Sequence, residues 1–314
     1  MPGGPVLTAE IQQPARAVPA GCPTGYKCGM NTTLLVGGDL CARTARHLDP
    51  SSWHCVALRR HPLSHDTDGR ILWFPADLRD PTSLSAALGA TPSVTHILYA
   101  PAPDRRTPEA YDEVYPRGLG MLLDALPEPE RLRRCVLVDS TAVWAPSEAW
   151  VNEETPARPD NFRGRSMLQA EALMHERLAK LPGAATGTAL RLSGLYGPGR
   201  LRLIDGLRAG RIKAPGGPGH WANRIHIDDA AAACAHLLTL AHPMPCYIGT
   251  DGHPMPTADL YDALARLSGS PRPEHEPQPA DGKRLSNERL RGSGWMPQWP
   301  DMAVGYAAAL ASDT

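Results

Sequence analysis

The sequence predicts an α/β protein built on a doubly wound parallel sheet. Short apolar runs alternate with helical patterns from residue 30 to residue 192, and this alternation is typical of a parallel sheet covered by helices on both faces. The chain has 314 residues, enough for one large domain with a smaller lobe. Right-handed crossovers would place a ligand crevice at the carboxyl ends of the strands.

The expected elements follow one another regularly. Strands are expected at 31–36, 53–58, 71–74, 97–99, 135–138 and 187–192. Helices are expected from about residue 39, from about residue 81, at 108–126 and at 164–180.

The pattern loosens after residue 192 into loops rich in glycine and proline. The pieces 193–222 and about 251–295 are expected to form a smaller substrate lobe over the crevice, while helix 227–240 and strand 247–249 return to the sheet. The predicted division is therefore a nucleotide-binding half at 30–192 and a C-terminal part at 193–314. That part is mostly lobe, and about 224–250 rejoins the core.

Residues 1–29 carry five prolines and several glycines without helical or strand periodicity. They also lack the charged start and apolar core of a signal peptide. We expect a flexible N-terminal extension there, and assign it no function.

Composition narrows the class of partner. Lys plus Arg total 32 against 33 Asp plus Glu, so no net charge draws the protein towards nucleic acid or membranes, and a small-molecule partner is favoured. The seven cysteines are scattered without C-x-x-C pairs or zinc-ligand spacing, which favours the reducing cytoplasm and no metal. No apolar run reaches the roughly 18 residues of a membrane helix.

The turn after the first strand is a candidate phosphate site. Backbone N–H groups at glycines and at a helix N-terminus can hold a pyrophosphate, as in the Rossmann fold. In the register of G-x-G-x-x-G, only Gly38 of the three glycines is present, because Val36 and Cys41 occupy the other positions. An ordinary strand-to-helix turn is the alternative. The expected cofactor contacts here are Gly37, Gly38, Asp39 and Leu40.

The second strand ends in Arg59 and Arg60, about twenty residues after the glycine turn. NAD-specific sites usually place an acid there, whereas an arginine can pair with the 2′-phosphate of NADP. We therefore expect NADP(H) to be preferred, with NAD(H) also possible, unless both arginines are simply solvated. Three further residues follow later strands at positions suited to the cofactor: Asp77, Leu78 and Ala100.

Four later segments, in order, resemble the NAD(P)-dependent epimerase/dehydratase family, the extended short-chain dehydrogenases/reductases. The segments are 136–144 (VLVDSTAVW), 190–200 (LRLSGLYGPGR), 223–230 (NRIHIDDA) and 282–287 (GKRLSN). The resemblance extends from residue 30 to the C-terminus and is strongest to an atypical, YeeZ-like branch. It implies a Rossmann doubly wound sheet with a smaller C-terminal substrate lobe.

The resemblance implies a catalytic apparatus that this chain only partly retains. The family uses a tyrosine as general acid/base, a lysine four residues later, and a serine on the preceding strand. Ser140 stands at the serine position, but Arg163 and Met167 stand where the tyrosine and lysine belong. Arginine does not exchange its proton near neutral pH and methionine carries no charge. Tyr115 is the candidate replacement acid, unless it only fills the core.

Three residues are candidate substrate contacts: Trp144, Arg163 and Tyr196. Arg163 could bind an anionic group, and the two aromatic side chains could form pocket walls, although their motifs are also structural corners of the family's fold.

Two functions remain open. The first is an NAD(P)-dependent oxidoreductase or epimerase/dehydratase-like enzyme acting on a small polar metabolite with non-standard acid/base residues. The second is a non-catalytic NADP(H)-binding sensor or partner protein. The family often dimerises through helices like 108–126 and 162–180, so a homodimer is also expected.

Overall fold

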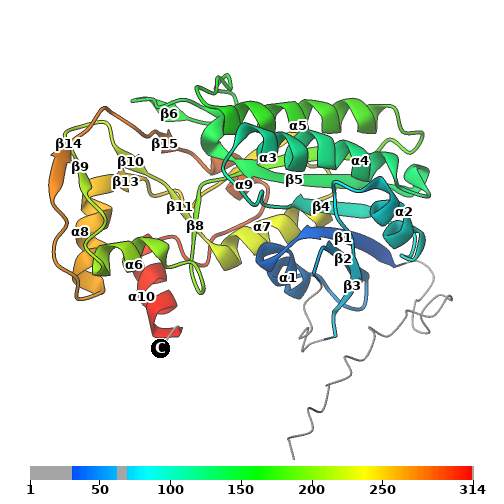
Figure 1. Ribbon diagram of the computed structural model, residues 1–314, viewed down its shortest axis with the longest axis horizontal. Coiled ribbons are helices and arrows are strands. Elements are labelled where there is room, and N and C mark those ends of the chain that lie inside the picture. Colours follow the sequence, from blue (N-terminus) through cyan, green and yellow to red (C-terminus); the bar gives the residue numbers. More distant parts are fainter. Residues whose placement is uncertain (1–29, 62–68, 313–314) are drawn as a thin grey trace, which may run out of the picture.

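The computed structural model describes residues 30–61 and 69–312, and the expected extension at 1–29 lies outside this part of the chain. Its centre is a seven-stranded sheet in the order β12-β7-β5-β4-β1-β2-β3, in which every pairing is parallel (Figure 1). The strands are β1 (Asn31–Gly37), β2 (Trp53–Arg59), β3 (Ile71–Pro75), β4 (His96–Ala100), β5 (Arg134–Ser140), β7 (Thr186–Leu192) and β12 (Cys246–Gly249). This arrangement confirms the predicted doubly wound sheet. The chain reverses its winding direction between β1 and β4, which lie side by side.

Helices cover both faces of the sheet because each presents an apolar stripe to it. One face carries α2 (Pro81–Gly89), α4 (Gly118–Asp124) and α5 (Phe162–Ala179), whose buried side chains form one core with β4 and β5. The other carries α1 (Asp39–Arg46), α7 (Ile227–Thr239) and the short α9 (Glu288–Gly292). Figure 1 shows α4 and α5 above the sheet and α1 and α7 below it.

The helix predicted at 108–126 is interrupted. It consists of α3 (Pro108–Asp112), a π-helical turn η1 (Glu113–Arg117) and α4. Pro116 lies inside the π-helical turn and has no N–H to continue the α-helical ladder. Within the same turn, the carbonyl of Val114 accepts a hydrogen bond from the hydroxyl of Tyr99 on β4, at 2.5 Å. The turn brings Tyr115 into the core beside the ends of the strands.

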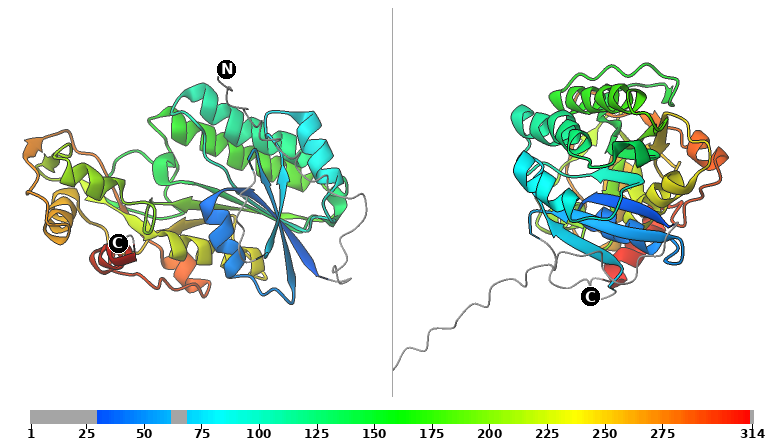
Figure 2. Two further views of the ribbon diagram at one scale, coloured as in Figure 1. Left: turned by 60° about the horizontal axis from the view of Figure 1, so that its bottom comes forward. Right: turned by 90° about the vertical axis from the view of Figure 1, so that its right-hand side faces the viewer.

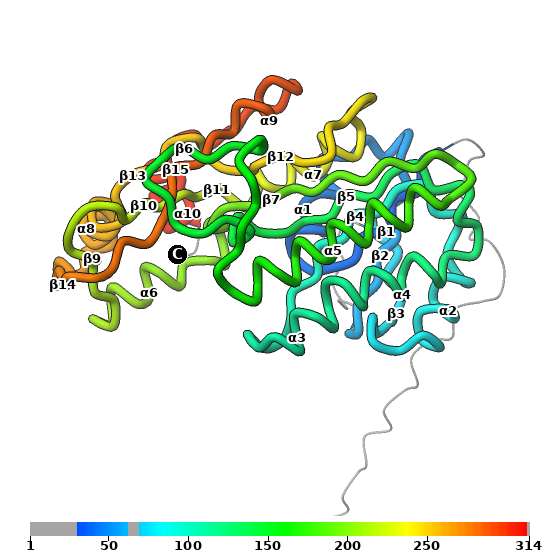
Figure 3. The backbone as a smooth tube through the Cα atoms, turned by 90° about the horizontal axis from the view of Figure 1, so that it is seen from above, coloured from blue at the N-terminus to red at the C-terminus, as the bar shows by residue number. Residues whose placement is uncertain are grey.

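A smaller lobe extends from one end of the sheet, with its own core (Figures 2 and 3). Its helices are α6 (Arg202–Arg208), α8 (Thr257–Leu267) and α10 (Met302–Ser312). The short paired strands are β8 (Gly194–Tyr196) with β11 (Arg224–His226), β9 (Ala214–Gly216) with β14 (His275–Pro277), β10 (Trp221–Ala222) with β13 (Met255–Pro256), and β6 (Trp150–Val151) with β15 (Arg284–Leu285). Two 3-10 turns, η2 (Pro129–Arg131) and η3 (Thr141–Val143), flank β5.

The C-terminal segments are distributed between the sheet and the lobe differently from the sequence-based expectation. Residues of α9 and the following loop, Leu290 and Trp295, pack into the core beneath the sheet, whereas α10 packs into the lobe. His226 caps α7 by accepting a hydrogen bond from the N–H of Asp228, at 3.3 Å. Among the described residues, no helix is both long and apolar enough to cross a membrane.

The lobe core generates a stability prediction at Gly305 in α10. A Cβ there would lie 2.1 Å from the hydroxyl oxygen of Tyr196, whose ring is fully buried and stacked on Tyr306 at 4.2 Å. We expect Gly305→Ala to lower the free energy of unfolding by roughly 1–3 kcal/mol through overpacking. Denaturant titration measures the loss.

A second helical glycine provides the control. A Cβ at Gly292 would meet no atom within 4 Å, so Gly292→Ala should leave stability unchanged or raise it by up to about 1 kcal/mol. Adding Tyr196→Phe to Gly305→Ala should restore part of the loss. Equal stability of the two alanine variants would contradict this packing.

Candidate functional site

Two cavities lie at the carboxyl ends of the strands and share Gly38, Pro101 and Ala102 in their linings. The first, of about 540 Å³, extends over the ends of β1, β2 and β3. The second, of about 400 Å³, lies between α1, the end of β5 and the start of α5. The two cavities adjoin each other where the winding of the sheet reverses, which is the usual ligand position in such folds.

The glycine turn has the backbone that a phosphate loop requires. Gly37 has φ +151°, and a Cβ there would lie 2.5 Å from the carbonyl oxygen of Ala100, so this position tolerates only glycine. A Cβ at Gly38 would instead meet no protein atom within 4 Å. Since Gly38 lines both cavities, its bare backbone leaves room for a ligand to approach the start of α1.

Asp39 in the first turn of α1 adds a negative charge near this backbone. Arg43 contacts its carboxylate at 2.8 Å and Arg200 contacts it at 3.4 Å. Arg43 also bonds Asp228 at 2.6 Å. The two arginines offset the charge of Asp39, so the loop remains compatible with the pyrophosphate of a dinucleotide. Leu40 and Ala100 line the second cavity beside it.

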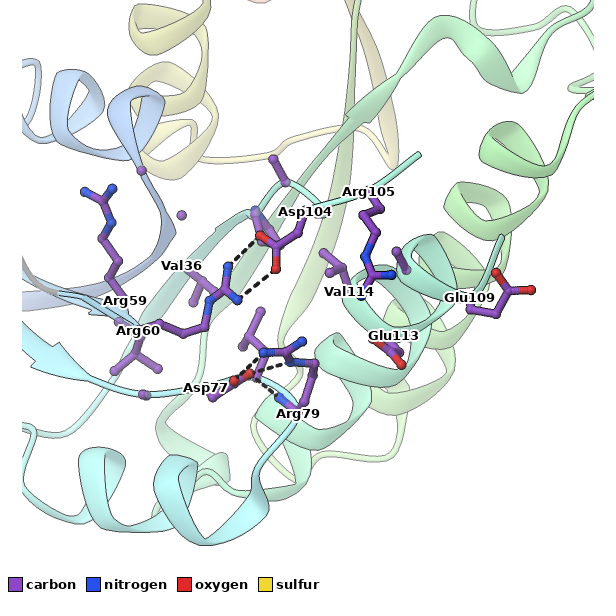
Figure 4. A pocket seen from close by; sticks show the side chains of 18 of the residues that line it. Val36, Arg59, Arg60, Asp77, Arg79, Asp104, Arg105, Glu109, Glu113 and Val114 are labelled. Carbon is purple, nitrogen blue, oxygen red and sulfur yellow. Dashed lines mark hydrogen bonds and ion pairs between the residues drawn. The ribbon is translucent and has the colours of Figure 1, made fainter. Parts of the chain in front are cut away.

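Charged side chains surround the first cavity (Figure 4). Arg60 makes a bidentate ion pair with Asp104, at 2.6 and 2.8 Å. Arg79 bonds Asp77 and lowers the pKa of that carboxyl to about 2. Arg59 points away from the Arg60–Asp104 pair, and within residues 30–61 and 69–312 it has no ion-pair partner. Leu78 adds an apolar wall to the same cavity.

The second cavity brings together the residues that the sequence assigned to chemistry. Ser140 lines it at the end of β5, and its side-chain oxygen accepts a hydrogen bond from the N–H of Ala142 at 3.2 Å. Tyr115 also lines it, with its hydroxyl donating to the carbonyl of Pro101 at 3.5 Å. Burial raises the pKa of Tyr115 above its ordinary value, which keeps the phenol protonated.

Arg163 and Met167, in the first two turns of α5, line this cavity too. Arg163 is exposed, whereas Met167 is buried. Gly164 lets the start of α5 approach η3, because a Cβ there would lie 2.2 Å from the carbonyl oxygen of Ala142. Arg163 and Met167, which the sequence predicts at the tyrosine and lysine positions, therefore both line this cavity.

Trp144 and Tyr196 lie apart from the linings of both cavities. The Trp144 ring is buried beneath the guanidinium of Arg191, 4.6 Å from the ring centroid, and its Nε1 donates to the carbonyl of Thr155. Tyr196 is fully buried in the lobe core. The structure thus places both in packing positions, and neither is used in the substrate site proposed below.

A buried acidic cluster was missed by sequence reasoning. Glu171 of α5 forms a bidentate ion pair with Arg191 of β7, at 2.7 and 2.8 Å. Although burial opposes ionisation, hydrogen bonds from Arg191 and from Asp139 lower the pKa of Glu171. Asp139 lies beside Arg191 in the sheet, and burial together with the charge of Glu171 raises its pKa well above the ordinary value. The signal in the sequence was a charged residue closing the otherwise apolar run 136–138.

Within residues 30–61 and 69–312, no group of three or more His, Cys, Asp or Glu side chains could hold a metal ion. The parallel sheet and the two adjoining cavities at its carboxyl edge define a Rossmann-type protein. No protein-family model matches the chain, and no curated protein matches it.

Solved structures identify the family. A protein from Methylobacillus flagellatus, described as an NAD-dependent epimerase/dehydratase, is 33% identical to this chain. Its structure has a TM-score of 0.73 over 90% of this chain and 98% of that chain. This chain therefore belongs to the NAD-dependent epimerase/dehydratase family.

Two further structures are similar. A conserved protein of unknown function from Silicibacter pomeroyi is 26% identical, with a TM-score of 0.66, over 90% of this chain and 99% of that chain. The UDP-Glc/GlcNAc 4-epimerase from Campylobacter jejuni shares the fold at 16% identity, with a TM-score of 0.75 and the same coverages.

The buried ion pair generates a pH-dependent prediction. Glu171→Gln leaves Arg191 buried without its counter-charge, and we expect it to lower the free energy of unfolding by about 3 kcal/mol. Glu171 has a lowered pKa, so at mildly acidic pH the wild type keeps the pair while Asp139 stays protonated, and the full loss appears. As the pH rises, Asp139 of the variant can ionise beside Arg191, so the loss should shrink.

Denaturant unfolding at several pH values measures this effect, and Glu176→Gln on the same helix is the control. Glu176 pairs with Lys180 at 2.6 Å on the exposed face, so its loss should change stability little. A loss at Glu171 that does not vary with pH would contradict coupling between Asp139 and Arg191.

Proposed function

We propose that this protein is an NAD(P)-dependent oxidoreductase or epimerase/dehydratase-type enzyme that acts on a small polar metabolite. The observation that carries the proposal is the pair of adjoining cavities that share Gly38 in their linings, with Ser140 lining the second cavity. Membership of the family supports the same class of chemistry. A bound nicotinamide would supply or accept a hydride. The protein would bind and orient the substrate, and would exchange the proton of its reacting oxygen.

Ser140 is the proposed orienting group for that oxygen. Its side-chain oxygen already accepts from the N–H of Ala142, which leaves the hydroxyl hydrogen free to donate. Arg163 is the proposed contact for an anionic group of the substrate, since its exposed guanidinium stands on the same cavity and forks well onto carboxylates or phosphates. A similar structure was solved in complex with UDP-glucose and NAD, so UDP-sugars belong among the substrates to test.

The proposed cofactor is NADP(H), with NAD(H) as the second choice. Arg59 supports this order because it closes β2 on the first cavity without a partner in the described parts of the chain. Arg60 is a weaker candidate, since Asp104 already occupies both arms of its guanidinium. The contacts proposed for the rest of the dinucleotide are Gly37, Gly38, Asp39, Leu40, Asp77, Leu78 and Ala100.

Arginine variants test the cofactor assignment. We expect Arg59→Ala to weaken NADPH binding at least roughly tenfold while NADH binding changes little, because a charge-assisted bond to the 2′-phosphate is lost. Nicotinamide fluorescence titration gives both dissociation constants.

Arg60→Ala provides the matched comparison at the next residue, and its effect on NADPH should be smaller. If Arg59→Ala weakened the binding of NADPH and NADH equally, the assignment of Arg59 to the 2′-phosphate would be wrong. Failure of the wild type to bind either nucleotide would remove the proposed function.

Ser140→Ala tests catalysis. With UDP-glucose and a panel of small aldehydes and 2-keto acids as probes, we expect this variant to lose hydride transfer roughly 100-fold with unchanged nucleotide binding. Absorbance of the reduced nicotinamide follows the reaction. Undiminished turnover would exclude Ser140 from the mechanism, whereas nucleotide binding without turnover on any probe would favour a non-catalytic NADP(H)-binding sensor, the alternative that the absent tyrosine and lysine support.

A further inference from the structure

Arg200 is a cation of the second cavity that has no role in the proposed function. It follows β8 and lines the cavity together with Gly38, Asp39 and Leu40, at the start of α1. Within the described parts of the chain its side chain makes no hydrogen bond, and its one ion-pair contact joins Nε to Oδ2 of Asp39 at 3.4 Å. Nε is buried, yet 36% of the side chain is exposed. The rest of the guanidinium is therefore available to a ligand.

The turn that carries Arg200 has a fixed backbone. The N–H of Arg200 donates to the carbonyl of Gly197 at 2.9 Å, and Gly199 has φ +73°. Together with Pro198 at the second position, this positive φ at the third is typical of a type II β-turn. Gly197 packs the turn against the start of α7, because a Cβ there would lie 2.8 Å from the side chain of Ile227. Only the side chain of Arg200 therefore needs to move to meet a ligand.

The neighbouring arginine is already committed. Arg43 bonds Asp39 at 2.8 Å and Asp228 at 2.6 Å, and only 19% of its side chain is exposed. Its bond to Asp39 is a hydrogen bond within α1, whereas the contact of Arg200 with Asp39 is longer and is not a hydrogen bond. Asp39 therefore keeps a partner if Arg200 turns away from it.

The linings of the two cavities indicate which phosphate Arg200 would meet. Gly38 lines both cavities, Arg59 lines only the first, and Ser140 and Arg200 line only the second. The proposed function places the adenosine end at Arg59 and the reacting end at Ser140, so the pyrophosphate would cross at Gly38. The phosphate on the nicotinamide side would then enter the second cavity, where the N–H groups at the start of α1 supply only partial positive charge.

We propose that Arg200 turns from Asp39 and binds the nicotinamide-side phosphate of the dinucleotide. This assignment rests on the proposed function. A guanidinium forms charge-assisted hydrogen bonds to phosphate oxygens, and two of its N–H groups can meet two oxygens in parallel. NAD and NADP share this phosphate, so Arg200 contributes equally to the binding of both, whereas Arg59 distinguishes between them.

Binding of nucleotides and their fragments tests this assignment without any turnover. NADPH and NADH are titrated by nicotinamide fluorescence, and ADP-ribose and AMP are measured by displacement of NADPH. We expect Arg200→Gln to weaken NADPH, NADH and ADP-ribose roughly tenfold each, because a charge-assisted contact is lost. AMP lacks the second phosphate, so its affinity should change by less than about twofold, which also shows that the adenosine end of the site is folded.

Two further substitutions serve as controls. Arg202→Gln removes the same charge two residues later, from an exposed position in α6 outside the linings of both cavities, and should leave all four affinities unchanged. Arg200→Lys keeps a positive charge without the planar fork, so its affinity for ADP-ribose should fall between those of the wild type and Arg200→Gln.

A double-mutant cycle separates phosphate binding from simple neutralisation of Asp39. Asp39→Asn removes the carboxylate and keeps the backbone N–H at the start of α1. If Arg200 binds the phosphate, Arg200→Gln should still weaken ADP-ribose roughly tenfold in the Asp39→Asn background. A loss that disappears in that background would mean that Arg200 only offsets the charge of Asp39, and would overturn the assignment.

Other results would also count against Arg200. Equal weakening of AMP and ADP-ribose, or unchanged binding of all four nucleotides, would overturn its assignment to this phosphate. Unchanged nucleotide binding with a raised KM for UDP-glucose or a 2-keto acid would overturn it too, and would assign Arg200 to the substrate. Failure of the wild type to bind any of the four nucleotides would instead overturn the proposed function on which the assignment rests.

Discussion

The close contact between the first turn and the neighbouring strand organises the whole site. Gly37 lies opposite Ala100 in the register of β1 and β4, with too little space between them for any side chain. This contact brings the start of α1 over the point where the sheet reverses its winding, and both cavities open there. Every proposed role depends on this geometry, because it decides which strand ends and loops face a common ligand.

The sequence predicted the sheet and most of its helices because the hydrophobic period and the length of each segment are local properties of the sequence, and tertiary packing changed few of them. It also brought Ser140, Arg163 and Met167 to one place, since family spacing encodes that geometry. It could not reveal that Trp144 and Tyr196 pack into cores, nor the π-helical turn around Pro116, because these depend on partners distant in the chain. The ion pairs of Arg60 with Asp104 and of Asp39 with Arg200 were hidden for the same reason.

The acidic cluster beneath α5 combines a buried ion pair with a second buried acid. The Glu171–Arg191 pair joins α5 to the sheet, and the adjacent Asp139 is buried beside it and hydrogen-bonds Glu171. Folding alone would favour an apolar residue at 139. Carboxyl groups whose pKa is shifted by burial and by a neighbouring acid are frequent beside functional sites.

Cys41 replaces the last glycine of the phosphate-loop pattern, and its burial has a practical consequence. The thiol lies in the contact between α1 and the sheet with no exposed surface, and burial raises its pKa far above the ordinary value. Thiolates, not thiols, react with alkylating reagents and peroxides. The Cys41 thiol should therefore not react with such reagents while the protein is folded. Labelling of Cys41 would report unfolding around the glycine turn rather than binding of a ligand there.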